Sequence, residues 1–157
     1  MRLTIALGAL LLAGSAHAGT SDATFASHVE GAYFITDESG VRGTLVFDAA
    51  GTVTQVVSDQ PELGFTAAQG AWVRDGDRGV RARLIDFDFE LPSGRPKSST
   101  VVVYEITFSS PESRRFLSLE GTIAGQSYAP PQDPLAPTEP PIGSFAASIS
   151  GERITVD

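Results

Sequence analysis

Residues 80–91 read VRARLIDFDFEL, and this stretch decides the fold class. Apolar and polar residues alternate along it, as in a β-strand whose side chains point to opposite faces in turn. Val80, Ala82 and Leu84 share one parity, whereas the later apolar residues share the other: Ile85, Phe87, Phe89 and Leu91. Because a regular strand cannot keep both sets inward, we predict a β-bulge or a sharp bend near residues 84–85. With that bulge, Arg81 and Arg83 fall outside as surface charges.

The same alternation recurs on both sides of this stretch, between short breaks of Gly, Pro, Asp and Ser. Residues 20–30 have the spacing of a short helix, and residues 59–62 are expected to form a loop. The predicted strands are residues 31–36, 41–47, 52–58, 65–74, 80–91, 99–109, 115–124 and 144–156. Strands in this order, joined mostly by short turns, can close on themselves. The predicted fold class is all-β, an antiparallel up-and-down eight-stranded β-barrel.

Two short motifs accompany this strand pattern. Gly31-Ala32-Tyr33 places a glycine and an aromatic residue at the first strand, and Gly70-Ala71-Trp72 precedes an Asp-Gly turn. With the meander that follows, the chain resembles the lipocalin and calycin superfamily, and it is similar to the small allene oxide cyclase-like barrels of bacteria. The resemblance implies one calycin-like barrel domain over residues 19–157, with an interior that holds side chains or one small ligand.

The N-terminus has the organisation of a signal peptide. Arg2 precedes the apolar run 3–13, and Ala16-His17-Ala18 places small residues before the expected cleavage site. The run is shorter than the about 20 residues that a membrane-spanning helix needs, and the absence of cysteine excludes a lipid anchor. We therefore predict a signal peptide over residues 1–18 and an exported, soluble domain, periplasmic or extracellular, without stable membrane insertion. An outer-membrane barrel is the rival architecture, but the first three strands are short for it.

Charge and proline content add two expectations. The net charge of −8 argues against binding of nucleic acid or of an anionic membrane surface, since both require a basic patch. Residues 129–142 hold six of the ten prolines, so this segment cannot be a helix or a central strand. We predict an extended, polyproline-like loop that connects two strands, covers a barrel mouth or recognises a partner.

Few residues offer reactive chemistry. His28 is the one histidine after residue 18, and cysteine is absent, which argues against a zinc site or a Ser- or Cys-based nucleophile. Asp86, Asp88 and Glu90 share one strand face; they could bind calcium or act as an acid and a base, but a solvated strand face is the expected reading. We assign no catalytic residue, no metal and no cofactor.

The alternating aromatic residues are the remaining candidate feature. If the barrel is hollow, they form the wall of an apolar pocket; if it is filled, they are core packing. The candidate ligand-binding residues are Tyr33, Trp72, Phe87, Phe89 and Tyr104. The leading hypothesis is non-enzymatic binding of a small apolar or amphipathic ligand. The alternatives are a protein-interaction or envelope-structural module that acts through its surface and proline-rich loop, and a barrel enzyme similar to allene oxide cyclase.

Overall fold

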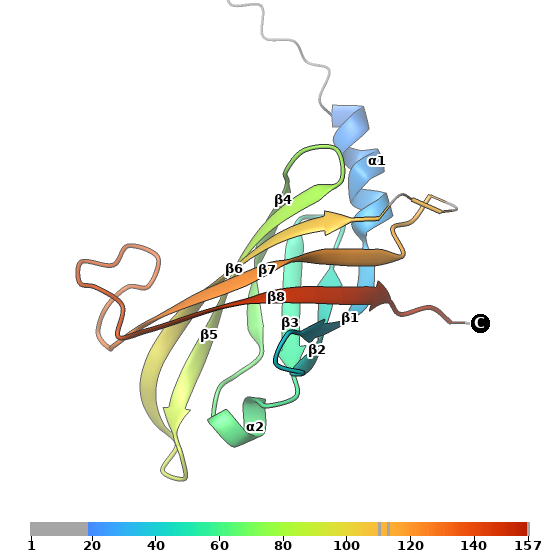
Figure 1. Ribbon diagram of the computed structural model, residues 1–157. Coiled ribbons are helices and arrows are strands. Elements are labelled where there is room, and N and C mark those ends of the chain that lie inside the picture. Colours follow the sequence, from blue (N-terminus) through green and yellow to red (C-terminus); the bar gives the residue numbers. More distant parts are fainter. Residues whose placement is uncertain (1–18, 110, 113, 157) are drawn as a thin grey trace, which may run out of the picture.

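A computed structural model of the protein describes residues 19–109, 111–112 and 114–156. Eight antiparallel strands follow one another around a closed barrel, and the last strand pairs with the first (Figure 1). This topology confirms the predicted fold class, an all-β up-and-down barrel. The expected signal peptide, residues 1–18, lies outside the described residues.

The strand order follows the chain, and two helices accompany it. The strands are β1 (Gly31–Asp37), β2 (Arg42–Phe47), β3 (Thr52–Val57), β4 (Ala68–Arg74), β5 (Gly79–Glu90), β6 (Arg95–Phe108), β7 (Ser118–Tyr128) and β8 (Gly143–Arg153). Helix α1 (Gly19–Val29) confirms the helix predicted for residues 20–30. A loop was expected at residues 59–62, but the chain forms the short helix α2 (Gln60–Leu63), which ends at Gly64 with a left-handed φ of 76°. No helix in the described part of the chain is long and apolar enough to cross a bilayer.

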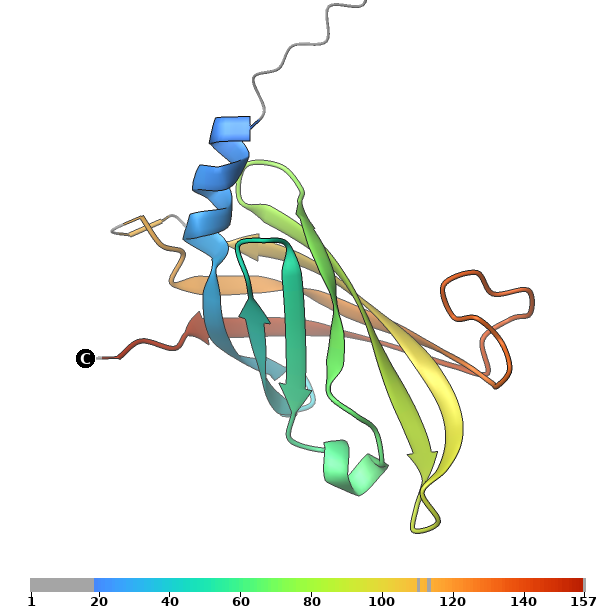
Figure 2. The same ribbon diagram turned by 180° about the vertical axis from the view of Figure 1, so that it is seen from behind.

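The barrel is asymmetric because strands β5–β8 are longer than strands β1–β4. Strands β5 to β8 contain 11 to 14 residues each, whereas β1 to β4 contain 6 or 7. Strand β8 pairs with β1 only from Ile149 onward, so residues 143–148 lie beyond β1. We call the part of β5–β8 that runs past the shorter strands the strand extension; it comprises residues 86–90, 95–100, 125–128 and 143–148. Helix α1 lies at the opposite end of the barrel (Figures 1 and 2).

Aromatic side chains fill the end of the barrel near α1. The rings of Tyr33, Phe47 and Phe108 lie with centroids 5.4 to 6.0 Å apart, all three buried. Trp72 and Phe116 extend the cluster, with Phe116 stacked on Phe108 at 4.9 Å. Tilted and edge-to-face pairs at these distances are favourable aromatic contacts. At this end the aromatic residues are therefore core packing.

Arg153 connects the last strand to the end of α1. Its guanidinium donates hydrogen bonds to the Tyr33 hydroxyl at 2.7 Å and to the Phe116 and His28 carbonyl oxygens at 3.1 and 3.2 Å. It also donates to the carbonyl oxygen of Glu30. A cation beside the C-terminal carbonyl groups of a helix is favourable, because these groups carry partial negative charge. Arg153 thus fixes the end of α1 to the barrel.

The predicted bulge near residues 84–85 is wrong. The register of β5 and β6 is continuous from Gly79↔Thr107 to Asp88↔Ser98, and it shifts only between Asp88 and Phe89. The inner row of β5 therefore continues from Leu84 to Asp86. The apolar set that begins at Ile85 has the outward parity instead, and the Phe87 side chain is 53% exposed.

The proline-rich segment 129–142 forms a loop, as predicted, but it is not one extended run. Two turns fold it, with the Gln132 amide donating to the Ala129 carbonyl and the Ala136 amide to the Asp133 carbonyl. The Gln132 side-chain oxygen accepts hydrogen bonds from the Thr138 and Glu139 amides. These contacts hold the loop in a folded shape beyond the ends of β7 and β8 (Figure 1).

Candidate functional site

The five residues predicted to bind a ligand do not converge. Tyr33 and Trp72 belong to the packed aromatic end, where their polar atoms already have partners. The Tyr33 hydroxyl donates toward the Val29 carbonyl at 3.0 Å and accepts from Arg153. The Trp72 indole N–H donates to the Asp48 carbonyl at 3.0 Å. In this structure both residues hold the fold together.

The expected inward orientation of Phe87 is wrong. Its neighbour Asp86 has the inner parity of β5, so Phe87 faces outward, and its amide donates to the Thr66 hydroxyl at 3.1 Å. Phe89 is half-buried beyond the register shift, opposite Pro96, and its amide donates to the Gly64 carbonyl at 2.7 Å. Of the five, Tyr104 alone is a buried inner residue whose polar atom has no hydrogen-bond partner.

Tyr104 lies beside a set of polar side chains on the inner face of the strand extension. We call this set the polar layer; its members are Asp86, Asp88, Ser98, Thr100, Ser127 and the Tyr104 hydroxyl. Asp88 accepts hydrogen bonds from the Ser98 hydroxyl at 2.7 Å and the Thr100 hydroxyl at 2.8 Å. The Thr100 and Ser127 hydroxyl oxygens lie 2.7 Å apart, which links β6 to β7. Asp88 is thus held by hydroxyl groups from the neighbouring strand.

Asp86 differs from Asp88 because part of its carboxylate has no partner. Its side chain is 7% exposed, and its Oδ1 atom is buried without a hydrogen bond. Burial, with a smaller contribution from the negative charge of Asp88, raises the pKa of Asp86 to about 7, while the Thr100 hydroxyl opposes the rise. The expectation that Asp86 belongs to a solvated strand face is wrong.

Within the polar layer, the Tyr104 hydroxyl is a second buried polar atom without a hydrogen-bond partner. Burial raises the pKa of Tyr104, and the negative charges of Asp86 and Asp37 act in the same direction. A buried polar group that lacks a hydrogen bond costs about 1–3 kcal/mol. A ligand that offers hydrogen bonds to Asp86 and Tyr104 would recover this free energy, so these two groups are the candidate recognition elements.

Sequence reasoning missed the hydroxyl members of the polar layer. Serine and threonine in a strand carry no periodic signal of their own, so Ser98, Thr100 and Ser127 were not singled out. One signal was available: Ser98 and Thr100 have the same parity as Val102 and Tyr104 along β6. Continuing that row past Val102 would have placed both hydroxyls inside the barrel.

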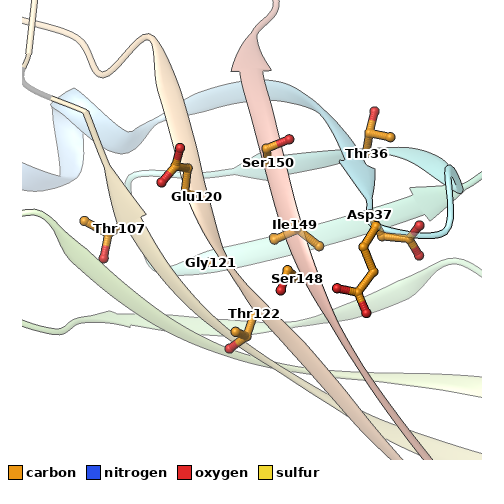
Figure 3. Close-up of a pocket in the computed structure, with 10 residues that line it drawn as sticks. Thr36, Asp37, Thr107, Glu120, Gly121, Thr122, Ser148, Ile149 and Ser150 are labelled. Carbon is orange, nitrogen blue, oxygen red and sulfur yellow. The ribbon is translucent and has the colours of Figure 1, made fainter.

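A separate hollow of about 770 Å³ lies on the outside of the barrel. Figure 3 shows hydroxyl and carboxylate groups from neighbouring strands around it. Its lining residues are Thr36, Asp37, Glu38, Thr107, Glu120, Gly121, Thr122, Ser148, Ile149 and Ser150. The Asp37 carboxylate is engaged locally, since it accepts hydrogen bonds from the Ser39 and Val41 amides at 2.8 and 2.9 Å. Burial raises the pKa of Asp37, but the hydrogen bond from the Ser39 hydroxyl and these amide bonds together outweigh it and lower the pKa.

Neither metal-binding groups nor similarity to known proteins points to a function. Among residues 19–109, 111–112 and 114–156, no group of three or more His, Cys, Asp or Glu side chains is placed to hold a metal ion. Comparisons with protein-family models, curated proteins and solved structures find no significant match.

Proposed function

We propose that this protein is an exported barrel that binds a small amphipathic molecule at the polar layer, with Asp86 and Tyr104 contacting its polar group. The observation that carries the proposal is the pair of buried, unpartnered polar atoms on the inner face, the Asp86 Oδ1 and the Tyr104 hydroxyl. Binding sites combine apolar walls with a few convergent polar groups, and the polar layer supplies polar groups of this kind on the inner face.

The polar group of the ligand is expected to donate hydrogen bonds. An ionised Asp86 only accepts them, and the neighbouring Asp88 makes the layer unfavourable for a carboxylate. The apolar end of the barrel is filled by the rings of Tyr33, Phe47 and Phe108, which leaves no reason to expect a purely apolar ligand there. An amine or an alcohol on a short alkyl chain fits the chemistry of the layer.

The test uses decylamine, decanol and decanoate, which share one chain and differ in the head group. Measured by thermal shift and by isothermal titration calorimetry, decylamine should stabilise the protein more than decanol does, and the decylamine effect should depend on Asp86. Asp86→Asn should weaken decylamine binding about tenfold or more, since a hydrogen bond to a charged group contributes about 1.5–3 kcal/mol. Asp75→Asn, in the exposed turn after β4, is the matched control and should leave the affinity unchanged. Equal binding by wild type and Asp86→Asn would contradict the proposal.

The polar layer also supports a second candidate, a barrel enzyme that uses acid–base chemistry. A buried carboxyl group with a pKa near 7 beside a tyrosine hydroxyl is suited to proton transfer at neutral pH. A ligand recovered with altered mass after incubation with wild type, but not with Asp86→Asn, would favour this candidate over simple binding.

Export rests on the N-terminal segment. The charged start, the apolar run and the small residues at 16–18 support cleavage before Gly19 and a location in the periplasm or outside the cell. Expressed with its own N-terminus in a bacterial host, the protein should fractionate outside the cytoplasm, and N-terminal sequencing should begin at Gly19. A cytoplasmic protein that retains Met1 would contradict export without bearing on the polar layer.

A further inference from the structure

The outer face of the barrel carries a groove between the proline-rich loop and the sheet. We call it the outer groove; its volume is about 680 Å³, within the range of small-molecule sites. It is lined by Ala71, Val73, Arg81, Ala82, Arg83, Val101, Val103, Gln126, Tyr128, Pro134 and Pro137. The lining is thus mainly apolar, with two arginines on one strand.

The apolar floor of the outer groove comes from neighbouring strands in register. Val103 lies opposite Arg83 on β5 and opposite Ala124 on β7, and Val101 is buried although it has the outward parity of β6. The buried Tyr128 also lines the outer groove, and its hydroxyl donates a hydrogen bond to the Gln126 side chain at 2.8 Å. The outer face therefore holds an apolar surface where an up-and-down barrel would usually present polar side chains to water.

The proline-rich loop supplies a preorganised wall. Pro134 and Pro137 line the outer groove, and the turns and the Gln132 contacts described above hold the loop around them. The Ile142 amide also donates to the Ser127 carbonyl at 2.8 Å, which fixes the loop to β7. A wall that is already ordered loses little conformational entropy when a ligand binds.

Arg81 and Arg83 give the groove its charge. They have the same parity on β5, so their Cα atoms lie about 6.7 Å apart. Both side chains are exposed, and neither takes part in a hydrogen bond or ion pair within the described residues. Arg83 lies opposite Ala71 and Val103, whereas Arg81 lies opposite Val73 and Glu105. Arg83 is therefore the arginine whose cross-strand neighbours are both apolar.

We propose that the outer groove binds a single-chain amphiphile with a carboxylate head, the head on Arg83 with support from Arg81 and the chain along the valine floor toward Pro134 and Pro137. The guanidinium group matches a carboxylate with two parallel hydrogen bonds. On a protein with a net charge of −8, an unpaired arginine beside an apolar floor favours an anionic ligand at this place. The head group required here is opposite to the one expected at the polar layer.

The experiment measures binding of decanoate, below its critical micelle concentration, by isothermal titration calorimetry on the purified protein. Arg83→Gln should weaken decanoate binding about tenfold or more. Arg81→Gln should weaken it less, because the cross-strand neighbour of Arg81 is the acidic Glu105, which repels an anionic head group. Arg83→Lys keeps the charge but loses the planar fork, so an intermediate loss is expected. Decylamine should show no dependence on Arg83.

Two controls separate this site from folding and from the polar layer. Arg42→Gln removes an exposed arginine at the start of β2, outside the groove, and should leave decanoate binding unchanged. Asp86→Asn should also leave decanoate binding unchanged. The proposal for the outer groove and the proposal for the polar layer are therefore tested independently. Decanoate binding that is absent or insensitive to Arg83, or preferential binding of an acidic peptide in its place, would overturn the proposal.

Discussion

Replacing Phe108 with alanine is expected to lower the free energy of unfolding by about 3–5 kcal/mol, the usual cost of removing a fully buried phenylalanine. Phe108 is 1% exposed, and its ring contacts those of Tyr33, Phe47 and Phe116. Removing the Phe108 ring leaves a cavity. The neighbouring rings could fill this cavity only if they moved and lost contacts with one another. Urea unfolding followed by circular dichroism measures the change.

Phe87→Ala is the matched control, because it removes the same side chain from the outer face. Phe87 is 53% exposed, so the expected loss is about 1 kcal/mol or less. The comparison tests the phase of β5 directly. Equal losses for the two variants, or a larger loss for Phe87→Ala, would show that the inner and outer rows have been assigned to the wrong faces.

Asp86→Asn is expected to make the protein more stable than wild type above neutral pH. The pKa of Asp86 rises from 3.8 to about 7 on folding, so between these values the folded protein binds a proton that the unfolded chain has released. Stability therefore falls as the pH rises through this window, and a shift of this size corresponds to about 4 kcal/mol in total. Asparagine keeps the shape of the protonated acid and does not ionise.

The measurement is the free energy of unfolding of wild type and Asp86→Asn at pH 5, 6, 7 and 8. The advantage of the variant should grow by about 2–3 kcal/mol between pH 5 and pH 8 and should level off above pH 7. Asp75→Asn, exposed in a turn, should show no such growth. A difference between wild type and Asp86→Asn that does not change with pH would mean that Asp86 ionises normally in the folded protein.

The instability caused by a charged Asp86 bears on the proposed function. A cationic head group at the polar layer would favour the ionised carboxylate and would remove part of this cost, so decylamine should stabilise wild type more at pH 8 than at pH 5. The outer groove has the opposite requirement, since its arginines stay charged over this range. One alkyl chain with two head groups therefore distinguishes the two sites.

Period-two alternation was enough to place the strands and the barrel in advance. The predicted strand 31–36 differs from β1 by one residue, and the predicted 80–91 differs from β5 by one residue at each end. Side chains of a strand alternate whatever the rest of the chain does, so this signal is local. Eight such strands with short connections leave few arrangements besides closure.

The sequence-based assignment of inward and outward side chains was wrong where residues are buried on both faces of the sheet. Beyond Leu84 the apolar residues of β5 point outward, and on the adjacent strands Val101 and Tyr128 are buried on that outer face, where Pro134 and Pro137 return toward the sheet. Asp86 and its hydroxyl neighbours occupy the inside. Hydrophobicity alone assigns the more apolar row of side chains to the core. This is why the sequence predicted a bulge near residues 84–85 and a solvated face for the carboxylates of β5.

The alternation of residue types along single strands determined an all-β barrel of eight strands, a lead-in helix and a non-helical proline-rich loop, because each of these depends on contacts close in the chain. Only the tertiary structure decided which row faces inward at the strand extension, where the loop folds back, and that polar atoms of Asp86 and Tyr104 are buried inside without partners. Those outcomes depend on side chains far apart in the sequence that compete for the same buried space, and no local pattern records that competition.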